Sequence, residues 1–197
     1  MKRIDAIKTV VADVPDLPIV VTLAATSREL AAVADRDNHL YLLDSMGLAP
    51  SVGTGLALAL ENSAIDRVLV LEGDGSLFMN LNALATLGYH RPHKLIVAVL
   101  DNGTYASTGG FNTYSSRVNL STVAISCGIN VLQAQDEQSL SDALKICRTT
   151  PGPHLIHVRI DPGNAPRIPL LLQDPVVLGA RFRAWLVNRT DTGATSV

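Results

Sequence analysis

The chain has 197 residues, a formal net charge of −2 and 47% hydrophobic residues. This length suits one domain with a sizeable core, and the hydrophobic fraction is too high for a disordered chain. The near-neutral charge gives no sign of a nucleic-acid-binding surface. Because no apolar run approaches a membrane span and the first residues lack a signal-peptide core, we expect a soluble, cytoplasmic protein.

The cysteines and histidines do not suggest a metal site. Cys127 and Cys147 form neither a disulfide framework nor a metal-ligand pattern, so we expect both to be small buried hydrophobic residues. None of the five histidines has a cysteine or carboxylate near it at ligand spacing. We therefore expect no catalytic histidine.

The first quarter of the chain predicts two helices and two strands. A helix is expected over residues 3–12 and a strand over 19–23, with prolines between them. A second helix follows over 28–34, and Ser27 is a plausible N-cap for it. A short strand over 40–43 comes next.

A turn at Asp44-Ser45-Met46-Gly47 follows this strand and leads into a helix. Val52, Leu56 and Leu60 share one face of that helix, and small residues surround them. A methionine beside a glycine is ordinarily core filling, so spacing alone gives Met46 no special role.

The central stretch, residues 67–110, predicts a strand, a helix and a second strand. Apolar runs over 68–71 and 95–100 each stop at a polar turn, and the segment 81–88 between them has helical spacing. Uninterrupted apolar runs suit strands that are buried on both faces of a parallel sheet. A right-handed crossover places both turns at the carboxyl ends of the strands, where open α/β sheets bind ligands.

The last third of the chain continues the alternation of helices and strands. We expect a helix, a strand, a helix, a strand and a final helix over residues 118–127, 130–132, 139–148, 154–160 and 176–187. The residues from 188 to 197 read as a polar, mobile tail.

The two central turns carry oxygen atoms that suit a metal ion. Asp74 offers a carboxylate, Asn102 an amide oxygen and Thr104 a backbone carbonyl. Mg²⁺ prefers octahedral oxygen ligands and usually takes the remainder from phosphate and water. We therefore predict that Asp74 and Asn102 meet at one edge of the sheet and hold Mg²⁺ together with Thr104.

The first turn also suits an anion. Gly73 and Gly75 allow a sharp turn and the close approach of a ligand, and Ser76 adds a free amide and hydroxyl near a helix start. The two turns together read as a cradle for a magnesium-bound diphosphate.

Gly73-Asp74-Gly75-Ser76 followed by Asp101-Asn102-Gly103-Thr104-Tyr105 resembles the thiamine-diphosphate-binding signature of thiamine-dependent decarboxylases. The strings Asp44-Ser45-Met46-Gly47-Leu48-Ala49 and Ser107-Thr108-Gly109-Gly110 are similar to the cofactor-binding half of sulfopyruvate and phosphonopyruvate decarboxylases. The resemblance covers roughly residues 18–160.

The element pattern and this resemblance together imply an α/β fold. The expected architecture is a single three-layer α/β/α domain with a doubly wound, mostly parallel sheet, of the type that binds the pyrophosphate of the coenzyme. This domain would span residues 1–187, and the polar tail would follow it.

The resemblance implies roles for further residues. In the family the loop after the first strand contacts the cofactor phosphates, which corresponds here to Thr26 and Ser27. A bulky apolar residue forces the two cofactor rings into a V, and Met46 matches it. The backbone carbonyl near Asp44 would accept a hydrogen bond from the aminopyrimidine. Residues 107–110 would form a loop over the active site, with hydroxyls placed for an acidic substrate.

Two positions depart from the family pattern. Ala24 and Ala25 occupy the loop in which a glycine is common, and Phe111 follows residues 107–110 where glutamine is common. These departures bear on the geometry of the loop and on recognition of the acidic group of the substrate.

Thiamine diphosphate needs a glutamate that promotes its reactive tautomer, and in the family this glutamate lies on a separate domain, normally on another chain. The local glutamates do not fit this role by position; they are Glu29, Glu61, Glu72 and Glu137. The resemblance therefore implies a β subunit that binds thiamine diphosphate and Mg²⁺. A pyrimidine-binding α subunit would supply the glutamate in an α2β2 or larger hetero-oligomer, and a small 2-oxoacid would be the substrate.

Other functions are compatible with the same residues. The chain would also suit the β subunit of a 2-oxoacid oxidoreductase or dehydrogenase, although two cysteines cannot ligate an iron–sulfur cluster. An acetolactate-synthase-like carboligase and a non-catalytic Mg-phosphate-binding or regulatory module are further alternatives.

Overall fold

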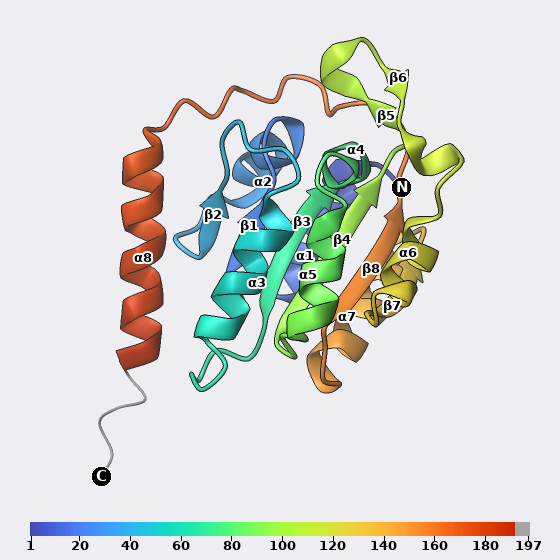
Figure 1. The fold of residues 1–197 in the computed structure, drawn as a ribbon. Coiled ribbons are helices and arrows are strands. Elements are labelled where there is room, and N and C mark those ends of the chain that lie inside the picture. Colours follow the sequence, from blue (N-terminus) through green and yellow to red (C-terminus); the bar gives the residue numbers. More distant parts are fainter. Residues whose placement is uncertain (192–197) are drawn as a thin grey trace.

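A computed structural model describes residues 1–191, which fold around a six-stranded parallel sheet (Figure 1). The strand order is β2-β1-β3-β4-β8-β7, and each neighbouring pair is parallel. The strands are β1 Ile19–Val21, β2 His39–Tyr41, β3 Val68–Gly73, β4 Leu95–Asp101, β7 Asn130–Ala134 and β8 His154–Arg159. The predicted parallel sheet is confirmed, with β3 and β4 adjacent in register.

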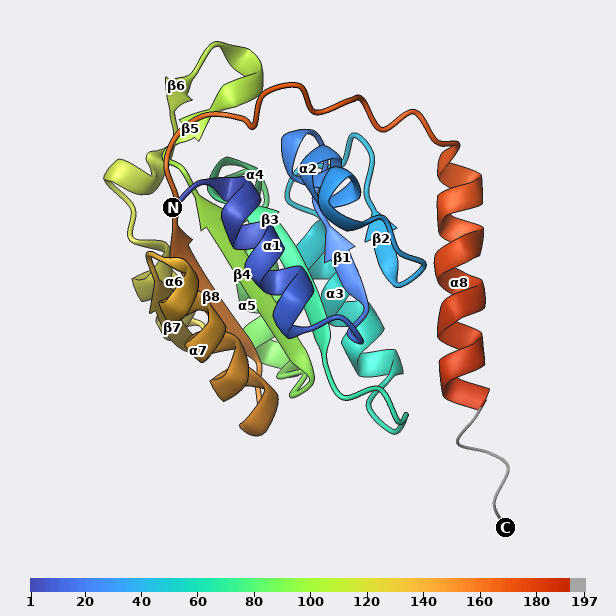
Figure 2. The same ribbon diagram turned by 180° about the vertical axis from the view of Figure 1, so that it is seen from behind.

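Helices cover both faces of this sheet, and the predicted three-layer α/β/α architecture is confirmed. The first cluster of buried apolar residues joins the sheet to α1, α2 and α7, and the second joins it to α3, α5 and α6. Figure 2 shows α1 and α7 in front of the sheet. The helices are α1 Arg3–Asp13, α2 Ala25–Ala34, α3 Ala49–Ala59, α4 Asp74–Phe78, α5 Asn82–His90, α6 Leu120–Ser126, α7 Glu137–Thr149 and α8 Pro175–Asp191.

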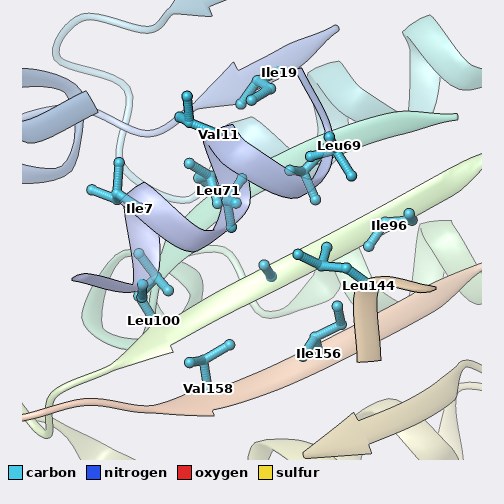
Figure 3. Close-up of a cluster of buried hydrophobic side chains, with 14 of the residues drawn as sticks. Ile7, Val11, Ile19, Leu69, Leu71, Ile96, Leu100, Leu144, Ile156 and Val158 are labelled. Carbon is cyan, nitrogen blue, oxygen red and sulfur yellow. The ribbon is translucent and has the colours of Figure 1, made fainter. Parts of the chain in front are cut away.

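The apolar runs of the sequence become the centre of the core. Every residue of β4 is buried, as are the first five residues of β3. Side chains alternate between the two faces, so Leu69 and Leu71 pack toward α1 while Val68 and Val70 pack toward α3 and α5. Figure 3 shows the first of these clusters, which includes Leu71 of β3 and Ile7 of α1.

Helix α8 packs against the edge strand β2. Leu178 joins the first apolar cluster, and Trp185 and Leu186 pack against the second. Covering the edge in this way hides backbone groups that would otherwise pair with another chain. None of the described helices is long and apolar enough to cross a membrane.

The C-terminal helix is longer than the sequence suggested. α8 continues to Asp191, so the expected tail is wrong for residues 188–191. The Arg189 guanidinium lies 5.6 Å from the centre of the Trp185 ring, one turn back along the helix, which favours the extra turn. The rest of the expected tail, 192–197, lies outside the described residues.

A small hairpin stands above the carboxyl edge of the sheet (Figure 1). Strands β5 Thr104–Tyr105 and β6 Phe111–Asn112 pair antiparallel, and the 3₁₀ helices η1 Ala106–Thr108 and η2 Tyr114–Ser116 follow β5 and β6 respectively. Gly109 and Gly110 have φ values of 94° and 80°, which side chains rarely adopt. The sequence predicted a loop over residues 107–110, whereas the segment forms part of a hairpin.

The start of α2 differs from the prediction. The helix begins at Ala25, and its N-cap is Ala24 with a φ of 60°, so Ser27 lies inside the helix and is not the cap. The Ser27 hydroxyl donates instead to the carbonyl of Thr22, 2.5 Å away. The loop therefore closes without a glycine, at the cost of a strained alanine.

Candidate functional site

A cavity of about 120 Å³ opens at the carboxyl ends of β1, β3 and β4. Asp74 and Asn102 both line it, as the crossover argument predicted. Most of the other predicted site residues line it too; they are Thr26, Met46, Gly73, Gly75, Ser76 and Thr104. Ser27 and Asp44 do not. Ser27 is buried against Thr22, and Asp44 is exposed in a left-handed conformation, with a φ of 51°.

Asp74 is a buried carboxylate that accepts a hydrogen bond from a neutral hydroxyl. It is 2% exposed, and its Oδ2 accepts a hydrogen bond of 2.5 Å from the Thr113 hydroxyl. Burial raises the pKa of Asp74, and the nearby charge of Asp101 raises it further, against the lowering effect of Thr113. A cation beside Asp74 would stabilise the ionised carboxylate against both effects and so lower its pKa.

Asp101 is held as an anion by cationic and polar neighbours. Its Oδ2 lies 2.8 Å from His157 Nε2 and accepts a hydrogen bond of 2.7 Å from Arg159. Burial alone would raise the pKa of Asp101, but the hydrogen bond from His157 and the charge of Arg159 lower it to about 2. Asp101 Oδ1 also accepts a hydrogen bond from the amide of Gly103, so this carboxylate fixes the turn after β4.

The same turn presents Asn102 to the cavity. The side-chain oxygen of Asn102 accepts the amide of Thr104 at 2.9 Å. An amide oxygen has two lone pairs, so a second partner can still bind it. Gly103 has a φ of 70°, which permits the tight return of the chain.

The Ser76 hydroxyl joins three loops and is not free, contrary to the prediction. It accepts the amide of Gly47 at 2.7 Å and lies 3.1 Å from the Thr22 hydroxyl. Asn80 donates to the Gly47 carbonyl at 2.8 Å. These bonds hold the turn that carries Met46 against the start of α4.

The two glycines of the first turn act differently from the expectation. Neither Gly73 nor Gly75 has a positive φ, so the sharp-turn argument is wrong for both. A Cβ at Gly75 would lie 2.5 Å from the Tyr105 ring, whereas a Cβ at Gly73 would meet no atom within 4 Å. Gly75 therefore makes room for Tyr105, and Gly73 leaves space beside the cavity.

Sequence reasoning missed several residues that line the cavity. Arg3 comes from α1, and its guanidinium bonds to Glu29 at 2.9 Å and to Asn164 at 2.5 Å. Asn164 itself comes from the segment after β8. Arg28 lines the cavity from α2, and its only side-chain hydrogen bond within the described residues goes to the Ala24 carbonyl. No spacing pattern relates these residues to the two turns.

No glutamate lines the cavity in the part of the chain that the structure describes. Glu29 is paired with Arg3, and Glu61 lies on the surface near His93. Glu72 is fully buried; its Oε1 accepts the Gly73 amide, while burial raises its pKa. These three glutamates therefore lie outside the cavity lining.

The donor set fits a hard cation. Residues 1–191 hold no group of three or more His, Cys, Asp or Glu side chains that could bind a metal. The available oxygens are instead one carboxylate, one amide and one backbone carbonyl, from Asp74, Asn102 and Thr104. Such a partial oxygen set suits Mg²⁺ that shares its other positions with phosphate and water.

Comparison with known proteins identifies the family of this domain. The family described as thiamine pyrophosphate enzyme, C-terminal TPP binding domain, matches residues 28–158. The chain is 40% identical over 182 residues to sulfopyruvate decarboxylase subunit beta of Methanothermobacter thermautotrophicus, covering 92% of this chain and 94% of that subunit.

A longer relative is equally similar. The chain is 41% identical over 197 residues to phosphonopyruvate decarboxylase of Streptomyces viridochromogenes. That match covers 99% of this chain but 49% of the relative, so the chain spans about half of its length.

Solved structures show the same fold at lower identity. The thiamine diphosphate-dependent 4-hydroxybenzoylformate decarboxylase of Rhodococcus jostii RHA1 aligns with a TM-score of 0.70 and 19% identity, over 84% of this chain and 33% of that one. Benzoylformate decarboxylase from Polynucleobacter necessarius aligns with a TM-score of 0.69 and 19% identity, over 83% of this chain and 33% of that one. The chain therefore belongs to the thiamine pyrophosphate enzymes, through the C-terminal TPP-binding domain of that family.

Proposed function

We propose that this chain is the β subunit of a thiamine-diphosphate-dependent decarboxylase that acts on a 3-substituted 2-oxoacid such as sulfopyruvate or phosphonopyruvate. The observation that carries the proposal is the convergence of Asp74 and Asn102 on one cavity that no glutamate of the described residues lines. The relatives named sulfopyruvate decarboxylase subunit beta and phosphonopyruvate decarboxylase support the substrate class.

The metal and the diphosphate would share the carboxyl edge of the sheet. Asp74, Asn102 and the Thr104 carbonyl would hold Mg²⁺. The amides of Gly75 and Ser76 lie in the first turn of α4, where no carbonyl precedes them in the helix, and would face the diphosphate.

Residues around the turns would position the rest of the coenzyme. Thr26 would add a hydroxyl to the diphosphate, while Ser27 supports the loop through its bond to Thr22. Met46, fixed through Gly47 and Ser76, would press beneath the two rings, and the carbonyl near Asp44 would face the aminopyrimidine. Bound thiamine diphosphate would supply the electron sink for loss of CO₂.

The size of the cavity supports a shared active site. Small-molecule sites usually enclose about 300–1,000 Å³. The 120 Å³ found here would take only one end of the coenzyme. A pyrimidine-binding α subunit would enclose the other end and bring the activating glutamate, in an α2β2 or larger assembly.

Coenzyme affinity tests the proposal. The chain is purified with its α subunit, and thiamine diphosphate is titrated in the presence of Mg²⁺. Asp74→Asn keeps the shape and removes the charge, so we expect the dissociation constant to rise at least a hundredfold. Asp142→Asn, which removes an exposed carboxylate from α7, should leave it unchanged. An unaltered dissociation constant in Asp74→Asn would overturn the assignment.

Product analysis separates decarboxylation from the related reactions. The assembled enzyme should release CO₂ from sulfopyruvate or phosphonopyruvate without an added electron acceptor. A carboligase is the alternative function. The chain is 28% identical over 134 residues to the acetolactate synthase isozyme 1 large subunit of Escherichia coli. Formation of acetolactate from pyruvate would favour that alternative.

A further inference from the structure

A second cavity, of about 610 Å³, lies at the carboxyl ends of β7 and β8. It shares no lining residue with the smaller cavity around Asp74. Its volume falls within the range of small-molecule sites, about 300–1,000 Å³. Open α/β sheets bind ligands at this edge, so the position is also suited to a ligand.

The lining of the larger cavity is polar and positively charged. It contains Arg117 and Arg159, and no aspartate or glutamate. The side chain of Arg117 makes no hydrogen bond or ion pair within residues 1–191 and is exposed to the cavity and solvent. Its charge is therefore available to a ligand.

Arg159 is only partly engaged. Its Nη1 donates to Asp101 at 2.7 Å, while its side chain is 62% exposed. A guanidinium has five N–H donors, so the rest of the group remains open to the cavity. The uncharged side chains of Gln133 and Gln135, from β7 and the residue after it, extend the wall.

We propose that this cavity binds a small organic molecule with an oxyanion group, such as a phosphate, a phosphonate or a sulfonate. Arg117 and Arg159 would hold the oxyanion, because the planar fork of arginine matches such groups. The cavity is larger than a bare ion needs, so an organic body would occupy the space beside Gln133 and Gln135.

Two hydrogen-bond paths connect this site to the smaller cavity. Ser115, which lines the larger cavity, lies 3.0 Å from the Thr113 hydroxyl, and Thr113 donates to Asp74. Arg159 donates to Asp101. A ligand held here would thus lie beside Ser115, which reaches Asp74 of the smaller cavity through Thr113, and beside Arg159, which holds the buried Asp101 in the turn before Asn102.

Titration with inorganic phosphate tests the site without any reference to decarboxylation. The full chain is labelled with ¹⁵N and titrated at constant ionic strength, with chloride as the balancing anion. We expect the amides of Ser116, Gln133 and Gln135 to shift with a common saturation curve. Arg117→Gln should weaken phosphate binding at least tenfold, and the exposed control Arg183→Gln on α8 should change it less than twofold.

A second variant adds charge to the cavity and leaves both arginines in place. Gln135→Glu should also weaken phosphate binding at least tenfold, because a carboxylate would repel the anion. Shifts confined to the amides of Gly75 and Ser76 would place the phosphate in the smaller cavity and overturn the proposal. Equal affinity in the wild-type chain and in Arg117→Gln would overturn it as well. Because the experiment uses no coenzyme or substrate, its outcome does not depend on whether the proposed decarboxylase function is correct.

Discussion

Gly88 lies where α5 meets the end of α6. A Cβ at this position would lie 1.8 Å from the Cys127 carbonyl oxygen, so the two helices would have to separate. We expect Gly88→Ala to lower the free energy of unfolding by about 1–3 kcal/mol, measured in urea. Gly55→Ala is the matched control in α3, where a Cβ meets nothing within 4 Å. It should raise stability by about 0.5–1 kcal/mol, and a similar loss in both variants would contradict the packing argument.

His39 is a neutral histidine inside the protein. It is fully buried, and its Nε2 has no partner among the described residues. Burial lowers the pKa of His39 to about 4. The unfolded chain takes up this proton near pH 6.5, so the contribution of His39 to stability is complete above that pH and is lost as the pH falls toward 4.

This shift predicts a pH dependence of stability. Between pH 7 and pH 4.5 the wild-type chain should lose about 2–3 kcal/mol more unfolding free energy than His39→Gln. His90→Gln, which changes an exposed histidine, should follow the wild type. Urea denaturation at the two pH values gives the comparison, and parallel losses in wild type and His39→Gln would show that His39 is not responsible.

The loop after β1 shows what sequence reasoning could not foresee at single residues. A serine immediately before a helical run is a favoured cap, so the sequence predicts Ser27 as the N-cap of a helix over 28–34. The protein instead caps α2 with Ala24 at a φ of 60° and uses the Ser27 hydroxyl on Thr22. Which residue caps α2 depends on the tertiary contacts of this loop, and local sequence propensity carries no information about those contacts.

Helix α8 contributes to stability through one face. Leu178 is 1% exposed and belongs to the first apolar cluster, whereas its neighbour Val177 is 60% exposed. Leu178→Ala should therefore lower the unfolding free energy by about 2–5 kcal/mol. Val177→Ala should change it by less than about 0.5 kcal/mol. Equal effects in chemical denaturation would mean that α8 does not pack on β2 in solution.

At the scale of elements, the sequence predicted the sheet better than the small structures above it. Asp74 and Asn102 converge because they follow neighbouring parallel strands, which the two apolar runs already indicated. The hairpin of β5 and β6 was missed because strands of two residues have no detectable alternation. The five-residue helix α4 is likewise too short to show periodicity.

At the scale of the whole molecule, the site gathers residues that are far apart in the chain. Arg3 and Asn164 meet beside the cavity although 161 positions separate them. Thr113 reaches Asp74 across 39 positions. No motif spacing links such residues, so only the folded arrangement reveals them, whereas Gly75, Ser76 and Thr104 lie inside the motifs themselves.

The segment between β8 and α8 crosses above the carboxyl edge of the sheet (Figure 1). It is tied down by the Ala165 amide, which donates to Glu29 at 3.0 Å, and by the Gly163 carbonyl, which accepts from Arg3. Asn164, between these two residues, lines the smaller cavity. Whatever fills that cavity should therefore restrain the strap of chain that passes over it.

Trypsin offers a direct report of this restraint, since the exposed Arg167 lies a few positions beyond Asn164. We expect thiamine diphosphate with Mg²⁺ to slow cleavage after Arg167 several-fold and to leave Asp74→Asn unprotected, as followed by mass spectrometry of the fragments. Equal protection of the wild-type and Asp74→Asn chains would show that the restraint at Arg167 does not depend on Asp74. A proteolytic footprint at one arginine would thus reveal coenzyme occupancy before any catalytic assay is possible.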